Sequence, residues 1–148
     1  MIGFKIEIMT RLLIGIDPGS NCGLATLDPA TKQLLLFQFN SNIEAMFFVM
    51  DLNDKYDIEM FIEDARLAKK SGYFAKTSNT GKLQGVGYVK GFSKEWEAFT
   101  RLLKLKCQML PIGQTKTTPE YFFQLTGIKT LKGEHHKRDA ALIILGRK

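Results

Sequence analysis

Three acidic residues stand at the ends of apolar runs in this 148-residue sequence. Asp17 and Glu63 each close an apolar run, and Asp139 opens the last one, Ala140–Leu145. A carboxylate buried without a partner cation costs several kcal/mol. Three that converge would therefore favour one hard divalent ion, or a pair about 4 Å apart. The alternative for Asp17 is that its side chain caps the Pro-Gly turn that follows it.

Two histidines precede Asp139 on the expected last helix, residues 134–145. His136 lies three residues and His135 four residues before Asp139, so either imidazole can share a helix face with this carboxylate. Imidazole binds divalent metals and can move protons near neutral pH. The alternative is that both histidines are solvated residues on a basic helix.

Charge is divided unevenly along the chain. Residues 1–65 carry four Lys or Arg against ten Asp or Glu, and residues 66–148 carry seventeen against five, so a net charge of +6 hides halves of −6 and +12. An acidic site beside a basic surface suits a metal-dependent nuclease, whose carboxylates hold cations while its lysines and arginines hold phosphates. The alternative is that these charges lie on solvated helix faces.

Residues 66–81 form a basic connection with no clear hydrophobic period. A loop of this length in a compact domain is usually functional or disordered. Its cations can follow a phosphate backbone and its adjacent aromatic residues can stack on unpaired bases, although Phe74 could instead pin the loop to the core. The expected DNA-binding residues are Arg66, Lys69, Lys70, Tyr73, Phe74 and Lys76 in this connection, and Lys82 directly after it.

Apolar runs and turn residues predict the elements that position these side chains. The run that ends at Asp17 predicts a buried strand, followed by a hairpin of Cys22–Leu27 and Leu34–Phe39. A helix capped at Ser41 should cross over to a parallel strand that ends at Glu63, which brings both acids to the same edge of the sheet. The remaining expected elements are a helix over 82–105, a third parallel strand over 107–112, and helices over 118–127 and 134–145.

This order of elements is the outline of a ribonuclease H-like α/β fold. It predicts a five-stranded mixed sheet, with strands 1–3 antiparallel, later strands parallel to the first, and helices on both faces. We expect one domain over 1–148, with 1–10 as a flexible or edge extension. No run approaches the ~20 apolar residues of a membrane span and no secretory signal is evident, so a cytoplasmic protein without membrane contact is expected. Cys22 and Cys107 fit buried thiols in a reducing compartment.

Three motifs resemble those of RuvC-type Holliday-junction resolvases, in particular the small phage-borne branch. They are LLIGIDPGS, MFIEDAR and HHKRDAALI, within residues 11–146. The resemblance implies a dimer that grips four-way or other branched DNA and nicks one strand per subunit, in the host cytoplasm if the protein is phage-encoded. It also implies a two-metal site for Mg²⁺ or Mn²⁺ with the ligands Asp17, Glu63, His136 and Asp139.

The resemblance assigns further roles, and one ligand departs from the common pattern. Many members of the family have Asp where this chain has His136, which predicts a shift toward Mn²⁺ or a looser second metal. Alternatively, His136 positions the attacking water or protonates the leaving oxygen. Lys116 matches a basic residue near the scissile phosphate. Tyr73 or Phe74 matches an aromatic residue that opens the centre of the junction.

The helix over 82–105 is the expected dimer contact. Gly87 and Gly91 share a face and would let another backbone approach, either from the sheet or from a second subunit. The spacing of Gly85, Gly87 and Gly91 does not fit a dinucleotide fingerprint, so no nucleotide cofactor is expected.

Two other functions stay open: a YqgF-type ribonuclease H-like nuclease for structured RNA, and a module that binds junctions without cutting. An actin-like sugar kinase is excluded because it needs two such domains.

Overall fold

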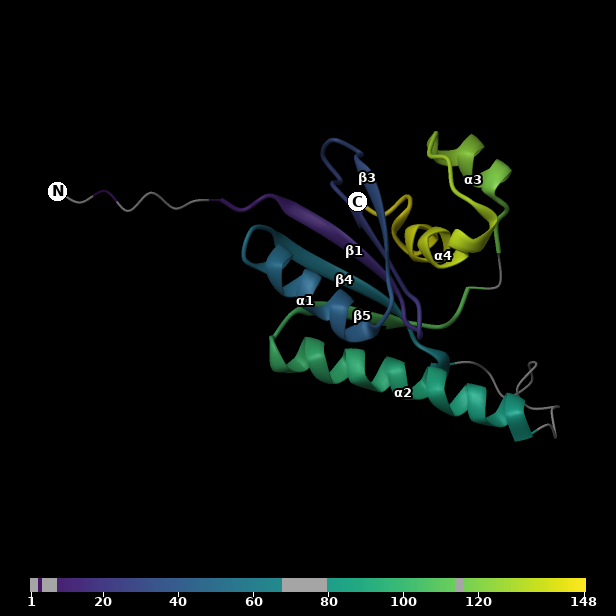
Figure 1. The fold of residues 1–148 in the computed structure, drawn as a ribbon. Helices are drawn as coiled ribbons and strands as arrows, with labels where there is room; N and C mark the ends of the chain where they lie inside the picture. Colours follow the sequence, from purple (N-terminus) through teal and green to yellow (C-terminus); the bar gives the residue numbers. More distant parts are fainter. Residues whose placement is uncertain (1–2, 4–7, 68–79, 114–115) are drawn as a thin grey trace.

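The computed structural model describes residues 3, 8–67, 80–113 and 116–148, with the backbone alone over 80–86. Its centre is a five-stranded sheet in the order β3-β2-β1-β4-β5 (Figure 1). The strands are β1 (Arg11–Asp17), β2 (Cys22–Leu27), β3 (Leu34–Phe39), β4 (Asp57–Glu63) and β5 (Lys106–Leu110).

Strand directions agree with the sequence prediction. β1 pairs antiparallel with β2, which pairs antiparallel with β3, whereas β4 lies parallel to β1 and β5 lies parallel to β4. The α/β class, the mixed five-stranded sheet and the hairpin over 22–39 are therefore confirmed. The third parallel strand ends at Leu110, two residues earlier than predicted.

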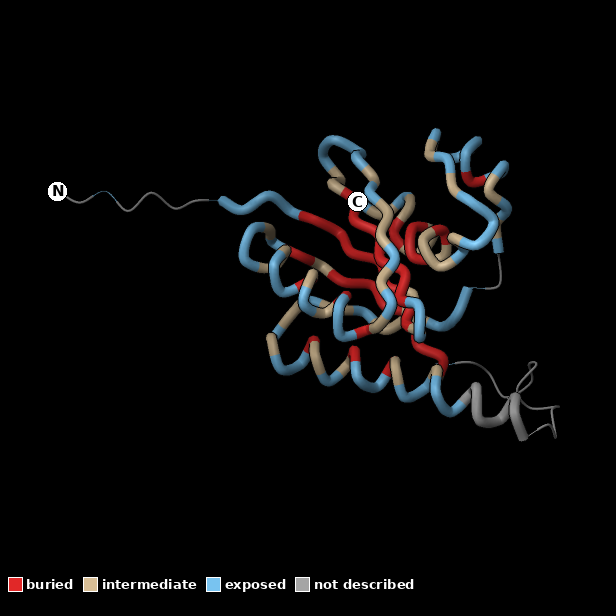
Figure 2. The backbone as a smooth tube through the Cα atoms, in the orientation of Figure 1, coloured by how far each residue is buried: buried red, intermediate tan, exposed pale blue. Residues whose placement is uncertain are grey.

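Helices cover both faces of the sheet, as predicted (Figure 1). Ala45, Val49 and Trp96 pack with one set of strand residues into one core, and helical residues that include Phe122 and Ala140 pack with the other set. Figure 2 shows that the buried chain is concentrated in the central strands of the sheet. The helices are α1 (Asn42–Asn53), α2 (Thr80–Leu102), α3 (Pro119–Thr126) and α4 (His135–Ile144), with short 3₁₀ turns η1 (Ala65–Leu67) and η3 (Lys132–Glu134).

Local capping sets most helix boundaries. The Ser41 side chain accepts a hydrogen bond from the Glu44 amide, and Thr118 caps α3, which ends at Gly127 with a φ of 73°. The cap at Ser41 confirms the prediction, and Thr118 and Gly127 lie at the predicted bounds of the later helix. The prediction for α2 was wrong at its ends, because the helix runs from Thr80 to Leu102 and Lys104 then takes a left-handed φ of 54°.

Apolar residues at helical spacing, among them Trp96 and Leu102, predict a buried stripe along α2, and this stripe is only partly buried. Trp96 is fully buried and donates from Nε1 to Asn42 Oδ1 at 2.8 Å. Leu102, however, is 81% exposed, so its assignment to the buried stripe was wrong. Within the described chain nothing lies within 4 Å of a Cβ placed on Gly87 or Gly91. The sheet therefore does not approach α2 at these glycines. Close approach of a second subunit stays a prediction.

Two glycines allow α4 to lie unusually close to the sheet. A Cβ on Gly15 in β1 would collide with the Ala140 carbonyl, and one on Gly23 in β2 would collide with the His136 carbonyl. Glycine is required at both places by this close approach. The N-terminal turns of α4 are thereby held against the carboxyl end of β1. In the described part of the chain, no helix combines the length and the apolar character needed to span a membrane.

Candidate active site

Asp17 and Glu63 lie side by side at the carboxyl ends of two adjacent parallel strands. Ile16 and Ile62 are register partners, and each is followed by its acid. Because side chains alternate along a strand, Asp17 points to the same face as Gly15, the face that α4 covers. The Glu63 and Asp17 side chains both line a cleft of about 1010 Å³.

Helix α4 brings the remaining predicted ligands into this cleft. The His136 backbone lies on Gly23, which is the register partner of Asp17. From there His136 Nδ1 reaches Asp17 Oδ2 at 2.8 Å. Asp139, one helical turn further on, lines the same cleft, as does Lys116 from the segment before α3. The five residues predicted to be catalytic are thus gathered at one place, although their roles stay predictions.

The carboxylates perturb one another. Burial, and after it the charges of Asp17 and Asp139, together raise the pKa of Glu63 to about 8, although a hydrogen bond from the Gly113 amide lowers it. The pKa of Asp139 is also raised, first by burial and then by Asp17, while Lys116 opposes the shift. Negative charge is therefore concentrated beyond what the neighbouring cations neutralise, which is the setting that a divalent cation relieves.

The two histidine rings lie against each other beside this cluster, with their planes inclined at 39°. Their ring centroids lie 4.0 Å apart, and both rings line the cleft. The pKa of His136 is raised mainly by its hydrogen bond to Asp17. With Asp17 ionised, Nδ1 is the donor in this bond.

The side chains of the cleft are of the kind that binds a hard divalent cation, but they do not surround a common point. Carboxylate oxygens are the ligands that Mg²⁺ and Mn²⁺ prefer. In the described residues, no three His, Cys, Asp or Glu side chains converge closely enough to hold an ion. One oxygen of Asp17 is instead engaged by His136. Binding of an ion would require these side chains to move closer to one another.

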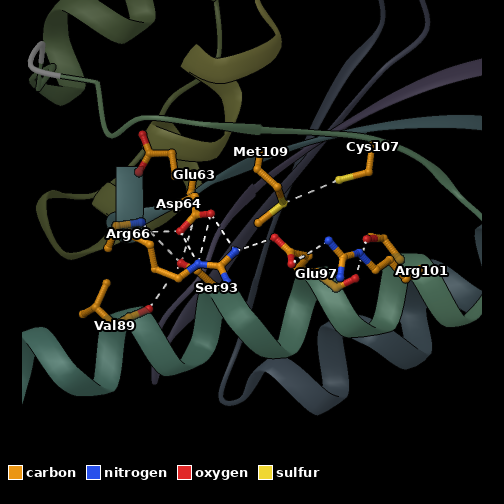
Figure 3. Close-up of polar contacts among 11 residues, drawn as sticks. Glu63, Asp64, Arg66, Val89, Ser93, Glu97, Arg101, Cys107 and Met109 are labelled. Atoms are coloured by element: carbon orange, nitrogen blue, oxygen red, sulfur yellow. Dashed lines mark hydrogen bonds and ion pairs between the residues drawn. The ribbon is translucent and has the colours of Figure 1, made fainter. Parts of the chain in front are cut away.

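Glu63 and Asp64 are adjacent at the end of β4, but among the described residues only Asp64 of the two belongs to an ion-pair network. Asp64 is 2% exposed and accepts from the Arg66 guanidinium, which also donates to Glu97 Oε2 at 2.6 Å. Ser93 Oγ accepts from the Ala65 amide, so α2 holds the chain that follows Glu63. Figure 3 shows the Glu63 carboxylate directed away from this network. Glu63 therefore lines the cleft, whereas Asp64 stabilises the end of β4 through its ion pair with Arg66.

The predicted DNA-binding residues have different outcomes. Arg66 forms ion pairs with Asp64 and Glu97, so its guanidinium has a structural role. Its contact with DNA stays a prediction. Lys116 is exposed and lines the cleft. Lys82 belongs to α2 but its side chain is not described. Lys69, Lys70, Tyr73, Phe74 and Lys76 lie outside the described residues.

Several residues that line the cleft were missed by the sequence reading. Tyr88 and Phe92 line it from α2, Tyr121 from α3 and Arg147 from the end of the chain. Tyr88 and Phe92 stand four apart, which is a usable signal for one helix face. No pattern in the sequence links Arg147 to the acids, because its position depends on how α4 crosses the sheet.

No family model matches this chain, and no curated protein matches it. The RuvC-type resemblance therefore rests on the three motifs that carry Asp17, Glu63 and Asp139. Their convergence on one cleft agrees with that resemblance without testing the activity.

Proposed function

We propose that this protein is a ribonuclease H-like, metal-dependent endonuclease that cleaves four-way junctions and other branched DNA. The observation that carries the proposal is the cleft that Asp17, Glu63 and Asp139 line together, where burial and the charges of the other two acids raise the pKa of Glu63. Three acids concentrated beside an exposed lysine, on a chain whose second half is strongly basic, suit a phosphodiester substrate better than a neutral one.

Asp17, Glu63, Asp139 and His136 would hold one or two Mg²⁺ or Mn²⁺ ions. Bound there, such ions would supply the Lewis acidity that activates a water and neutralises the charge that builds on the phosphoryl oxygens in in-line hydrolysis to a 5′-phosphate and a 3′-hydroxyl. Lys116 offers a positive charge to a strand at the mouth of the cleft. Burial of Glu63 and Asp139 excludes part of the water that would otherwise screen these charges.

His136 has two roles open to it. Its hydrogen bond to Asp17 holds that carboxylate in the cleft, and an imidazole released from this bond would be a ligand with more affinity for Mn²⁺ than for Mg²⁺. Only the role as a ligand predicts that the enzyme works better with Mn²⁺.

The proposed active form is a homodimer through α2. Exposed Gly87 and Gly91 stand on one face of that helix, with nothing close to them in the described part of the subunit. Close packing of the α2 helices of two subunits at these glycines would form a dimer with one cleft in each subunit. A two-fold particle suits a four-way junction, which presents two equivalent strands.

One observation favours a second candidate, a module that binds junctions without cutting. The ligands are not drawn into a cage in the described residues, and Asp17 is engaged by His136. If these side chains do not rearrange around an ion, the basic surface would still bind DNA while the cleft stayed inert.

A cleavage panel separates the candidates. End-labelled four-way junction, fork, matched duplex and structured RNA are incubated with the protein in Mg²⁺ and in Mn²⁺. The proposal expects symmetric nicks in the junction, faster in Mn²⁺, loss of cutting in Glu63→Gln, and retention in the matched control Glu59→Gln on the same strand. Junction that is bound but uncut supports the module, and preferential cutting of RNA supports a nuclease of the YqgF type.

A further inference from the structure

Arg147 is a second cation of the cleft, and its side chain is fixed in place. It lines the cleft together with Glu63 and Asp139. Nε donates to the Ile143 carbonyl at 2.8 Å, and the guanidinium carbon lies 4.1 Å from the centroid of the Phe61 ring. A hydrogen bond and a stacked ring together restrict a long side chain that would otherwise be free.

Arg147 differs from the other arginines in what its terminal nitrogens contact. Arg11, Arg66 and Arg101 pair with carboxylates, and buried Arg138 donates to three carbonyls and a threonine hydroxyl. In the described chain, Arg147 forms no ion pair and uses only Nε as a donor. Its two terminal nitrogens are therefore available to an anion from outside.

The place of Arg147 relative to the acids is set by strand β4. Phe61 and Glu63 are two residues apart and face the same side of the sheet, which separates their Cα atoms by roughly 6.6 Å. The guanidinium over Phe61 therefore stands beside the carboxylate cluster, set back from it by about one pleat of the strand. A guanidinium cannot bind a metal ion, but it matches a phosphate in shape and charge.

We infer that Arg147 binds a phosphodiester of the substrate strand next to the one that is cleaved, so that Lys116 and Arg147 hold the strand across the carboxylates. This inference rests on the proposed function. The alternative is that Arg147 only covers the Phe61 ring, which is 4% exposed, and contributes to packing alone.

The test is the salt dependence of DNA binding. A labelled four-way junction is titrated with protein in EDTA at several salt concentrations, using wild type, Arg147→Gln, Arg147→Lys and the control Lys148→Gln. Each phosphate contact contributes about 0.9 to the slope of log K against log salt. We expect Arg147→Gln to lower the magnitude of the slope by about 0.9 and the affinity about tenfold. Arg147→Lys should keep the slope and lose about threefold in affinity, and Lys148→Gln should resemble wild type.

A double variant separates binding from packing. If the ring serves to hold the guanidinium, Phe61→Leu should weaken binding in the wild type but not further in Arg147→Gln, with folding of each variant checked by thermal melting. In cleavage assays Arg147→Gln should raise KM while kcat stays within about twofold, because the metal ligands are untouched.

The outcomes distinguish this inference from the proposed function. A wild-type slope and affinity in folded Arg147→Gln would overturn the role of Arg147. Wild type that binds the junction and cuts nothing would overturn the proposed function, while the slopes still decide the role of Arg147. Failure of wild type to bind any branched DNA would overturn both.

Discussion

His136 Nδ1 lies 2.8 Å from Asp17 Oδ2, although 119 residues separate the two in sequence. The bond joins the first turn of α4 to the end of β1, at the place where Gly23 lets the helix backbone touch the sheet. It occupies a carboxylate oxygen that an ion would use. Metal binding and the His136–Asp17 hydrogen bond therefore compete for the same atom, unless the ion takes the other oxygen of Asp17.

Replacement of His136 by Asp tests this competition. His136→Asp should shift the metal preference of cleavage from Mn²⁺ toward Mg²⁺ by about tenfold in the ratio of rates, because a hard oxygen ligand replaces imidazole and Asp17 is released. The measurement is the single-turnover rate on a junction in each metal. His135→Asp is the control, since the described structure shows no hydrogen bond between His135 and Asp17. An unchanged ratio of rates in His136→Asp would remove any special role for the imidazole.

The raised pKa of Glu63 predicts how stability depends on pH in metal-free buffer. The folded chain holds a proton on Glu63 up to a pKa of about 8, whereas the unfolded chain releases it near 4.5. The contribution of this group is therefore full below pH 4.5 and is lost as pH rises through about 8. Glu63→Gln should flatten this dependence and melt at least about 2–4 °C above wild type at pH 8. Parallel melting curves from pH 5 to 9 would contradict the assigned shift.

Loss of Arg66 should destabilise the fold whatever the chain binds. Arg66→Ala leaves Asp64 buried at 2% exposure without its cation, which should lower the free energy of unfolding by about 3 kcal/mol in urea denaturation. Arg101→Ala is the control, because Arg101 is 78% exposed and should cost less than about 1 kcal/mol. Equal losses in the two variants would mean that the buried network does not hold the end of β4.

Two glycine substitutions should act in opposite directions. Gly23→Ala forces α4 away from the sheet, so it should cost about 2 kcal/mol or more and abolish cleavage. Gly87→Ala meets nothing within 4 Å in the subunit and should stabilise it by roughly 0.5–1 kcal/mol through helix propensity. If two subunits pack at this glycine, the same variant should weaken the dimer in analytical ultracentrifugation. A dimer of unchanged affinity would place the subunit contact elsewhere.

Much of the fold could be predicted because its local signals are strong. The runs that end in Asp17 and Glu63, the cap at Ser41 and the helix over 118–127 each depend on neighbouring residues, and all were confirmed. Errors fell where tertiary context decides. Leu102 fits the apolar stripe in sequence, yet α2 ends there at the surface.

The candidate site was only partly accessible from the sequence. The three acids can be recognised in the sequence because each stands at one end of an apolar run. The role of Gly15 and Gly23, in contrast, depends on where α4 crosses the sheet. The same crossing places Arg147 over Phe61. Likewise, the commitment of Arg66 to Asp64 and Glu97 cannot be read from a basic loop sequence, because Glu97 lies 31 residues away.

Calorimetric titration with Mn²⁺ at pH 8 tests directly whether the three carboxylates of the cleft hold a divalent ion. The proteins compared are wild type, Asp17→Asn, Glu63→Gln and Asp139→Asn, with Glu59→Gln as the control. We expect wild type and Glu59→Gln to bind Mn²⁺ and each of the three cleft variants to lose at least about tenfold in affinity, because the proposal has all three carboxylates share one ion. Binding of Mn²⁺ with the same affinity in all five proteins, or in none, would contradict it.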